Sequence, residues 1–208
     1  MLIDKLHYIT QAVEGKSHAE LTELACQGGV RWVQFRAKNL GFDEWKKEAL
    51  AVQEVCKKYH AALLINDNVK VAEEINANGV HLGKNDMDAD KARKILGDDF
   101  IIGGTANSYE DILRLAEWKV DYIGLGPFRF TTTKENLSPT LGIDGYFGIL
   151  QAMREDRINI PVIAIGGITL EDVDELMTIG AHGVAVSGAI SKAKDVKGVA
   201  SAFISSVI

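Results

Sequence analysis

The sequence predicts an α/β fold, namely a TIM (β/α)8 barrel that forms a single domain over residues 1–208. Short apolar segments alternate strictly with segments of helical periodicity, and eight such pairs fit along the chain. No turn of the Asn-Gly type joins two strands directly. Strict alternation indicates a parallel sheet, and eight repeats favour its closure into a barrel. The length of 208 residues matches the lower end of the range for this fold.

The strands are predicted from short apolar runs bounded by glycine, proline or polar residues. The run at 61–65 is apolar throughout, as expected for a strand buried on both faces. The run at 121–124 ends in the Gly126-Pro127 turn. The eight predicted strands comprise residues 6–10, 31–35, 61–65, 79–82, 100–103, 121–124, 161–165 and 183–186.

The helices are predicted from apolar residues that recur at helical spacing and from capping residues. Ser108 is a candidate N-cap, with Asp111 positioned to complete a capping arrangement, and Gly97 and Gly180 each follow the end of a helix. The predicted helices comprise residues 17–27, 41–58, 68–76, 88–96, 108–118, 146–155, 170–179 and 193–207. An open doubly wound sheet is the alternative, but no GxGxxG follows the first strand.

The composition is that of a globular protein, with 47% hydrophobic and 25% charged residues. A formal net charge of −6 and the lack of a Lys/Arg-rich run disfavour nucleic acid as a partner. The sequence has no signal-peptide pattern and no run of membrane-spanning length, so we expect a cytoplasmic protein that does not bind membranes. Cys26 and Cys56 fall on apolar helix faces and are interpreted as unreactive buried thiols.

Anion-binding groups are predicted in two of the loops that follow strands, and all such loops open on one face of a barrel. Gln34, Arg36 and Lys38 occupy alternate positions, so extended backbone would place their side chains together. This pattern favours a pyrophosphate-sized anion site over a solvated strand edge. Beyond the sixth strand, Thr131, Thr132, Thr133 and Lys134 offer hydroxyls and an ammonium to phosphate oxygens. The alternative there is an exposed threonine-rich loop.

A carboxylate pair after the third and fourth strands predicts a magnesium site. Asn66 and Asp67 follow the third strand, and Asp86 follows the fourth. Mg²⁺ binds one or two protein carboxylates together with water and substrate phosphates. The alternatives are a turn or helix cap for Asp67 and a simple loop acid for Asp86.

Small residues after the seventh and eighth strands predict a phosphate site, because their backbone N–H groups can approach the anion closely. They are Gly166, Gly167, Ser187 and Gly188. Thr105 and Asn107 follow the fifth strand, where either could instead cap the next helix. His81 lies within a strand, a position more typical of a packed core histidine than of a catalytic one. No histidine has partners that suggest a catalytic triad.

These residues resemble the thiamine-phosphate synthase family over nearly the whole chain. The resemblance rests on seven motifs in order, QFRAK, LINDN, GVHLGKND, IIGGT, DYIGLGPFRFTTTK, PVIAIGGI and GVAVSGAI. It implies a transferase of thiamine biosynthesis that needs Mg²⁺. Such an enzyme joins a hydroxymethylpyrimidine diphosphate to a thiazole phosphate and releases pyrophosphate.

The resemblance also implies roles for individual residues. Gln34, Arg36, Lys38 and Asn66 would bind the pyrimidine diphosphate, with Mg²⁺ on Asp67 and Asp86. Arg36, Lys134 and Thr105 would be the catalytic residues at this substrate. The thiazole phosphate would be bound by Thr131, Thr132, Thr133, Gly166, Gly167, Ser187 and Gly188. The chain departs from the usual family residues at Asn68, Thr105 and Gly188, where Arg, Ser and Ser are common. Thr105 keeps a hydroxyl and Gly188 keeps a backbone N–H.

Two alternative functions share these features in part. A thiazole tautomerase of the TenI type has the same barrel and phosphate loops but needs neither the diphosphate site nor the metal pair. A non-catalytic sensor of phosphate ligands could use the same fold. The sequence leaves open whether the barrel is a monomer or a homodimer, whether residues 136–142 close as a lid, and which form of thiazole phosphate is accepted.

Overall fold

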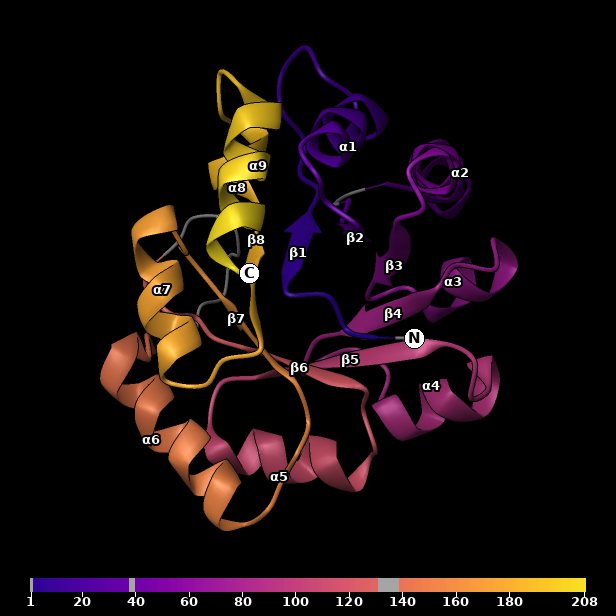
Figure 1. Cartoon of the computed structure of the whole chain (residues 1–208). Coiled ribbons are helices and arrows are strands. Elements are labelled where there is room, and N and C mark those ends of the chain that lie inside the picture. Colours follow the sequence, from indigo (N-terminus) through magenta and orange to yellow (C-terminus); the bar gives the residue numbers. More distant parts are fainter. Residues whose placement is uncertain (1, 38–39, 131–138) are drawn as a thin grey trace.

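The chain folds as a closed barrel of eight parallel strands surrounded by helices (Figure 1). The computed structural model describes residues 2–37, 40–130 and 139–208. Each strand pairs with the next one along the chain, and β8 pairs with β1 to close the ring. The predicted single-domain TIM barrel is therefore confirmed.

The strands are short, and a helix follows each of them in the described part of the chain. The strands are β1 (Leu6–Ile9), β2 (Trp32–Phe35), β3 (Ala62–Asn66), β4 (Gly79–Leu82), β5 (Ile101–Ala106), β6 (Tyr122–Leu125), β7 (Val162–Ile165) and β8 (Gly183–Val186). The helices are α1 (His18–Gln27), α2 (Phe42–Lys58), α3 (Val69–Glu74), α4 (Ala89–Leu96), α5 (Tyr109–Glu117), α6 (Gly142–Glu155), α7 (Leu170–Thr178), α8 (Gly188–Ser191) and α9 (Val196–Ser206).

Three predicted boundaries were wrong, two of them because contacts distant in sequence extend an element. β5 continues to Ala106 because Thr105 and Ala106 pair with β6. α6 begins at Gly142 rather than at residue 146; the Leu141 and Gly142 amides donate to the Pro127 and Phe128 carbonyls. The helix predicted at 193–207 begins later, as α9 at Val196, and the short α8 that precedes it was not predicted. Asp195 caps α9 by accepting from the Gly198 amide at 2.9 Å.

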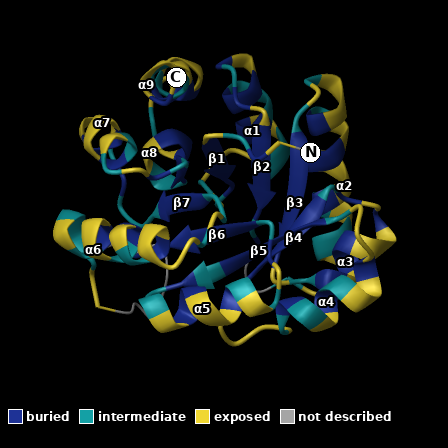
Figure 2. Ribbon diagram, turned by 60° about the horizontal axis from the view of Figure 1, so that its bottom comes forward, coloured by how far each residue is buried: buried dark blue, intermediate teal, exposed yellow. Residues whose placement is uncertain are grey.

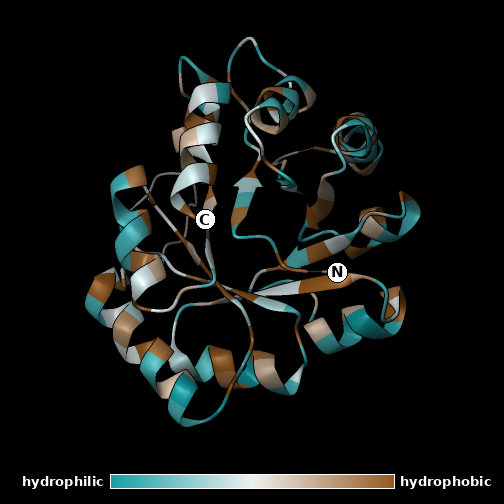
Figure 3. Cartoon of the chain, in the orientation of Figure 1, coloured by the Kyte–Doolittle hydropathy of each residue, from teal (hydrophilic) through white to brown (hydrophobic). Residues whose placement is uncertain are grey.

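The main core lies between the barrel and its helices. Strands are dark in Figure 2, whereas the outer helix faces are exposed. The helices show the matching alternation of hydrophobic and hydrophilic stripes in Figure 3. A second, smaller cluster fills the inside of the barrel and includes Trp32, Leu64, Tyr122 and Ile163. Side chains alternate along each strand, so the remaining inward positions are free to carry polar groups.

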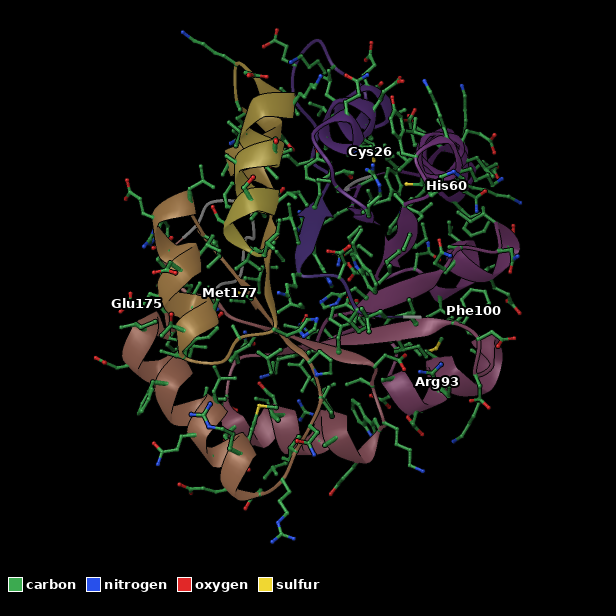
Figure 4. All side chains as sticks on the ribbon, viewed as in Figure 1. Cys26, His60, Arg93, Phe100, Glu175 and Met177 are labelled. Atoms are coloured by element: carbon green, nitrogen blue, oxygen red, sulfur yellow. The ribbon has the colours of Figure 1, made fainter. Side chains whose placement is uncertain are left out.

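Structural contacts link α4 to the N-terminal ends of β5 and β6. Arg93 of α4 donates to the Phe100 carbonyl and pairs with the Asp121 carboxylate at 2.6 Å, which ties α4 to the segments that enter β5 and β6 (Figure 4).

Cys26 and Cys56 are both buried free thiols, as predicted. Burial raises the pKa of Cys26 to about 11. Within the described residues, no helix combines the length and apolar character that crossing a bilayer requires.

Candidate active site

A pocket of about 470 Å³ opens at the C-terminal ends of the strands. Ten of the predicted site residues lie in the described part of the chain, and all ten line this pocket. They are Gln34, Arg36, Asn66, Asp67, Asp86, Thr105, Gly166, Gly167, Ser187 and Gly188. The other five, Lys38, Thr131, Thr132, Thr133 and Lys134, lie outside the described residues. The barrel therefore gathers residues that are up to 154 positions apart in the sequence, as Gln34 and Gly188 are.

The β2 side of the pocket carries Gln34 and Arg36. Gln34 is within β2 rather than after it, and it is buried with its side chain on the inner face of the barrel. The buried Thr10 hydroxyl accepts from the Arg36 amide at 3.0 Å and contacts His18 Nδ1 at 2.8 Å. The end of β1 therefore fixes the backbone from which Arg36 enters the pocket.

The two predicted metal-binding carboxylates converge on Gly83. The Gly83 amide donates to Asp86 Oδ2 at 2.6 Å. A Cβ atom placed on Gly83 would lie 2.7 Å from Asp86 Oδ2 and 4.0 Å from Asp67 Oδ1. Asp67 has a left-handed backbone with φ of +63°, a conformation that aspartate tolerates better than most residues, and its amide donates to the His81 carbonyl at 2.8 Å. The cap of α3 is Asn68, which accepts from the Val71 amide, so Asp67 does not serve as the helix cap.

This arrangement fits Mg²⁺ in its donor chemistry. Carboxylate oxygens are the hard ligands that Mg²⁺ selects. Over residues 2–37, 40–130 and 139–208, no group of three or more His, Cys, Asp or Glu side chains could hold a metal. Two carboxylates suffice for an ion that takes its other ligands from phosphate and water.

A buried polar cluster supports the β4–β5 side of the pocket. His81, on the inner face of β4, contacts the Thr105 hydroxyl through Nε2 at 3.0 Å and the Tyr122 hydroxyl through Nδ1 at 2.9 Å. Thr105 lies within β5 and does not cap α5. That helix is capped by Ser108, as predicted, which accepts from the Asp111 amide. Asn107, the other candidate cap, donates to the Gly126 carbonyl through its side chain.

The two small-residue loops form the opposite side. Gly166 and Gly167 have φ values of +102° and +71°, in the left-handed region that glycine adopts without steric cost. A Cβ on Gly167 would lie 2.5 Å from Arg129 Cγ, so glycine is required there by space as well. Arg129 pairs with Asp172 of α7 at 2.5 Å, which fastens the segment after β6 to this loop. The Ser187 hydroxyl, which precedes α8, donates to Gln11 Oε1 at 3.1 Å.

Lys84 is a pocket residue that the sequence reasoning did not select. Its ammonium pairs with Asp111 Oδ2 at 2.7 Å, and Arg114 pairs with the other oxygen. Burial alone would raise the pKa of Asp111, but hydrogen bonds from Lys84 and the Asn107 amide and the charge of Arg114 hold it below its usual value. Its position in the sequence could have indicated a pocket residue, because Lys84 lies in the GKND run directly after β4.

The whole chain resembles proteins of one family. The family model described as thiamine monophosphate synthase matches residues 6–190. The thiamine-phosphate synthase of Phocaeicola vulgatus is 48% identical over 191 residues, 92% of each chain. That of Flavobacterium johnsoniae is 48% identical over 200 residues, 94% of this chain and 92% of the relative.

A solved structure supports the same relationship. The thiamine phosphate pyrophosphorylase of Pyrococcus furiosus superposes with a TM-score of 0.86 at 30% identity, covering 98% of this chain and 95% of the other. A 3-hexulose-6-phosphate synthase, at 16% identity and a TM-score of 0.67, shares the fold alone. The motifs, the barrel, the pocket and these relatives agree, and the chain belongs to the thiamine monophosphate synthase family.

Proposed function

We propose that this protein is a thiamine-phosphate synthase, a transferase that acts on two small-molecule substrates. It would join 4-amino-2-methyl-5-hydroxymethylpyrimidine diphosphate to 4-methyl-5-(2-hydroxyethyl)thiazole phosphate, giving thiamine phosphate and pyrophosphate. The observation that carries the proposal is the convergence of Arg36, Asp67 and Asp86 with the Gly166–Gly167 and Ser187–Gly188 loops in one pocket. Such a pocket offers separate places for a diphosphate and a monophosphate.

The diphosphate would bind on the β2–β4 side. Arg36 offers a guanidinium that can bind phosphate oxygens in a bidentate manner, and Lys38 and Lys134 would add charge from residues outside the described part of the chain. Asp67 and Asp86 would hold Mg²⁺. When bound, Mg²⁺ would neutralise charge on the pyrophosphate leaving group. Gln34, Asn66 and Thr105 line the inner end of the pocket, where they can hydrogen-bond the pyrimidine.

The thiazole phosphate would bind on the opposite side. Backbone N–H groups of the Gly166–Gly167 turn and around Ser187 and Gly188 are suited to a phosphate, because glycine allows close approach. Thr131, Thr132 and Thr133 are proposed to complete this site from outside the described residues. Ile165, Ile168 and Ala185 also line the pocket, and their apolar surface is suited to an aromatic ring.

The reaction needs positioning and charge stabilisation rather than a side-chain nucleophile. The C–O bond to the diphosphate breaks, and its electron pair leaves on the pyrophosphate oxygen. The electron-rich aminopyrimidine delocalises the resulting positive charge on its exocyclic carbon. The thiazole nitrogen then donates its lone pair to that carbon to form the C–N bond, without a proton transfer. Fixed orientation of two reactants can supply about 7–11 kcal/mol of such a barrier.

The proposal is tested by measuring pyrophosphate and thiamine phosphate after the two substrates are mixed with the purified protein and Mg²⁺. We expect both products in equal amounts, and none after chelation by EDTA. A tautomerase would instead isomerise the thiazole without releasing pyrophosphate. A sensor would bind either phosphate compound without turnover. Either of these results would contradict the proposed synthase activity.

A further inference from the structure

Lys84 brings a cation to the pocket from the loop that follows β4. Its side chain lines the pocket together with Gly83 and Asp86 of the same loop. The Lys84 ammonium donates to Asp111 Oδ2 at 2.7 Å. The Lys84 side chain is 40% exposed, whereas that of Asp111 is 6% exposed. The ion pair therefore joins a buried carboxylate to a cation that stays accessible to a ligand.

Asp111 lies behind the pocket wall and holds the ammonium there. The Asn107 amide donates to the same oxygen, Asp111 Oδ2, at 2.9 Å. Asn107 and Lys84 both line the pocket, whereas Asp111, which belongs to α5, does not. Because two lining residues meet on one buried oxygen, the charged end of Lys84 lies beside the pocket.

The Asp111 carboxylate does not cancel all of the positive charge around it. Arg114 donates to the other oxygen, Asp111 Oδ1, at 2.7 Å. One buried carboxylate therefore faces two cations, and the cluster keeps an excess of positive charge. A lysine ammonium has three N–H groups. Within the described part of the chain, Asp111 is the single acceptor of the Lys84 ammonium, which leaves N–H groups for an anionic ligand.

The place of Lys84 in the barrel indicates which anion it would bind. Lys84 is two residues from Asp86, and β4 lies next to β3, which Asp67 follows. β8, which leads to the proposed thiazole phosphate loop, lies across the ring from β4. Lys84 is therefore on the side proposed for the diphosphate. A lysine ammonium is a compact point charge that suits phosphate oxygens.

We propose that Lys84 is a further substrate-binding residue, whose ammonium donates to the diphosphate of the pyrimidine substrate while Asp111 holds it at the pocket wall. The proposal rests on the proposed synthase function. It assigns Lys84 to the diphosphate alone, so the thiazole phosphate should not sense its loss.

Calorimetric titration of the full chain with inorganic pyrophosphate in the presence of Mg²⁺ tests this contact without turnover. Lys84→Gln keeps a polar side chain beside Asp111 but removes the charge. We expect the Kd for pyrophosphate and the KM for the pyrimidine diphosphate to rise about tenfold or more, the usual value of a hydrogen bond to a charged group. The KM for the thiazole phosphate should not change.

Arg114→Gln provides the matched control. Arg114 pairs with the same carboxylate at the same 2.7 Å, and its side chain is similarly exposed, at 45%, but it does not line the pocket. Each substitution takes one of two cations from Asp111, so both should lower the thermal unfolding temperature. Only Lys84→Gln should weaken pyrophosphate binding. Equal losses of pyrophosphate affinity in the two variants would show that Lys84 acts through Asp111 and the fold, and would overturn the proposal.

Two further measurements test whether the charge of Lys84 carries the effect. Lys84→Arg, which keeps the charge, should bind pyrophosphate more tightly than Lys84→Gln. Added KCl should weaken pyrophosphate binding by the wild type more steeply than by Lys84→Gln, because salt screens the charge that the variant lacks. An unchanged Kd in Lys84→Gln would overturn the contact. A wild type that releases no pyrophosphate from the two substrates would instead refute the synthase function itself.

Discussion

The Gly83 amide donates a hydrogen bond of 2.6 Å to Oδ2 of Asp86, and this bond holds the carboxylate beside Asp67. Gly83 is the first residue after β4, so the strand end itself orients the Asp86 carboxylate. When a group that orients a metal-binding side chain is lost, metal affinity commonly falls roughly 10- to 100-fold.

Gly83→Ala should weaken the response to Mg²⁺ without unfolding the barrel. The added Cβ would lie 2.7 Å from Asp86 Oδ2, the free end of a side chain that can move away. We expect the Mg²⁺ concentration for half-maximal pyrophosphate release to rise about tenfold or more, with an unchanged unfolding temperature. Gly148→Ala, where a Cβ meets nothing within 4 Å, is the control. An unchanged Mg²⁺ titration would show that the Gly83–Asp86 contact does not orient a metal ligand.

Asp67→Asn should abolish most turnover and leave folding intact. Asparagine tolerates the left-handed backbone of residue 67, φ +63°, whereas alanine would add strain. The substitution removes the negative charge with little change of shape, and we expect kcat to fall about 10²- to 10³-fold, as for the loss of one strong electrostatic contact. Steady-state kinetics at saturating Mg²⁺ and urea unfolding provide the two measurements. Near-normal kcat would exclude Asp67 as a metal ligand.

Asp172→Asn should lower stability in a manner that depends on pH. Burial would raise the pKa of Asp172, but hydrogen bonds from Thr169 and Arg129 and the charge of Arg129 bring it below the ordinary 3.8. A lowered folded-state pKa means that the stabilisation is fully present above pH 3.8 and is lost as the pH falls through the folded value.

We therefore expect Asp172→Asn to cost about 1–3 kcal/mol of unfolding free energy at pH 7. The difference from the wild type should shrink below pH 4. Urea unfolding of the variant and the wild type at pH 7, 5, 4 and 3 measures this difference in unfolding free energy. A difference that is constant or grows on acidification would contradict the carboxylate's role.

Glycines inside and outside the barrel should respond to alanine with opposite signs. A Cβ on Gly103 would overlap the Tyr122 ring at 2.2 Å, so Gly103→Ala should destabilise by about 1–3 kcal/mol, as overpacking does. Gly148 lies within α6 with open space around it, so Gly148→Ala should stabilise by about 0.5–1 kcal/mol. Thermal and urea unfolding of both variants measure the difference. Equal changes in unfolding free energy for the two variants would show that the barrel interior can accommodate the extra methyl group.

The sequence by itself determined the fold class, nearly all of the elements and ten of the residues that line the pocket. Apolar runs between glycines mark strands because a buried parallel strand needs apolar residues on both faces. Site residues could be named because every strand of a parallel barrel delivers its following loop to one face. This logic requires only the order of elements, and order is visible in the sequence.

Only the tertiary structure decided which groups touch. The contacts of Lys84 with Asp111 and of His81 with Thr105 and Tyr122 join residues on different elements. They depend on the register between strands, such as His81 opposite Gly103 and Thr105 opposite Gly124. The short helix α8 (Gly188–Ser191) was likewise not predicted from the sequence. Local patterns encode the elements, whereas contacts across the barrel arise from closing all eight strands at once, a long-range constraint that no short stretch of sequence contains.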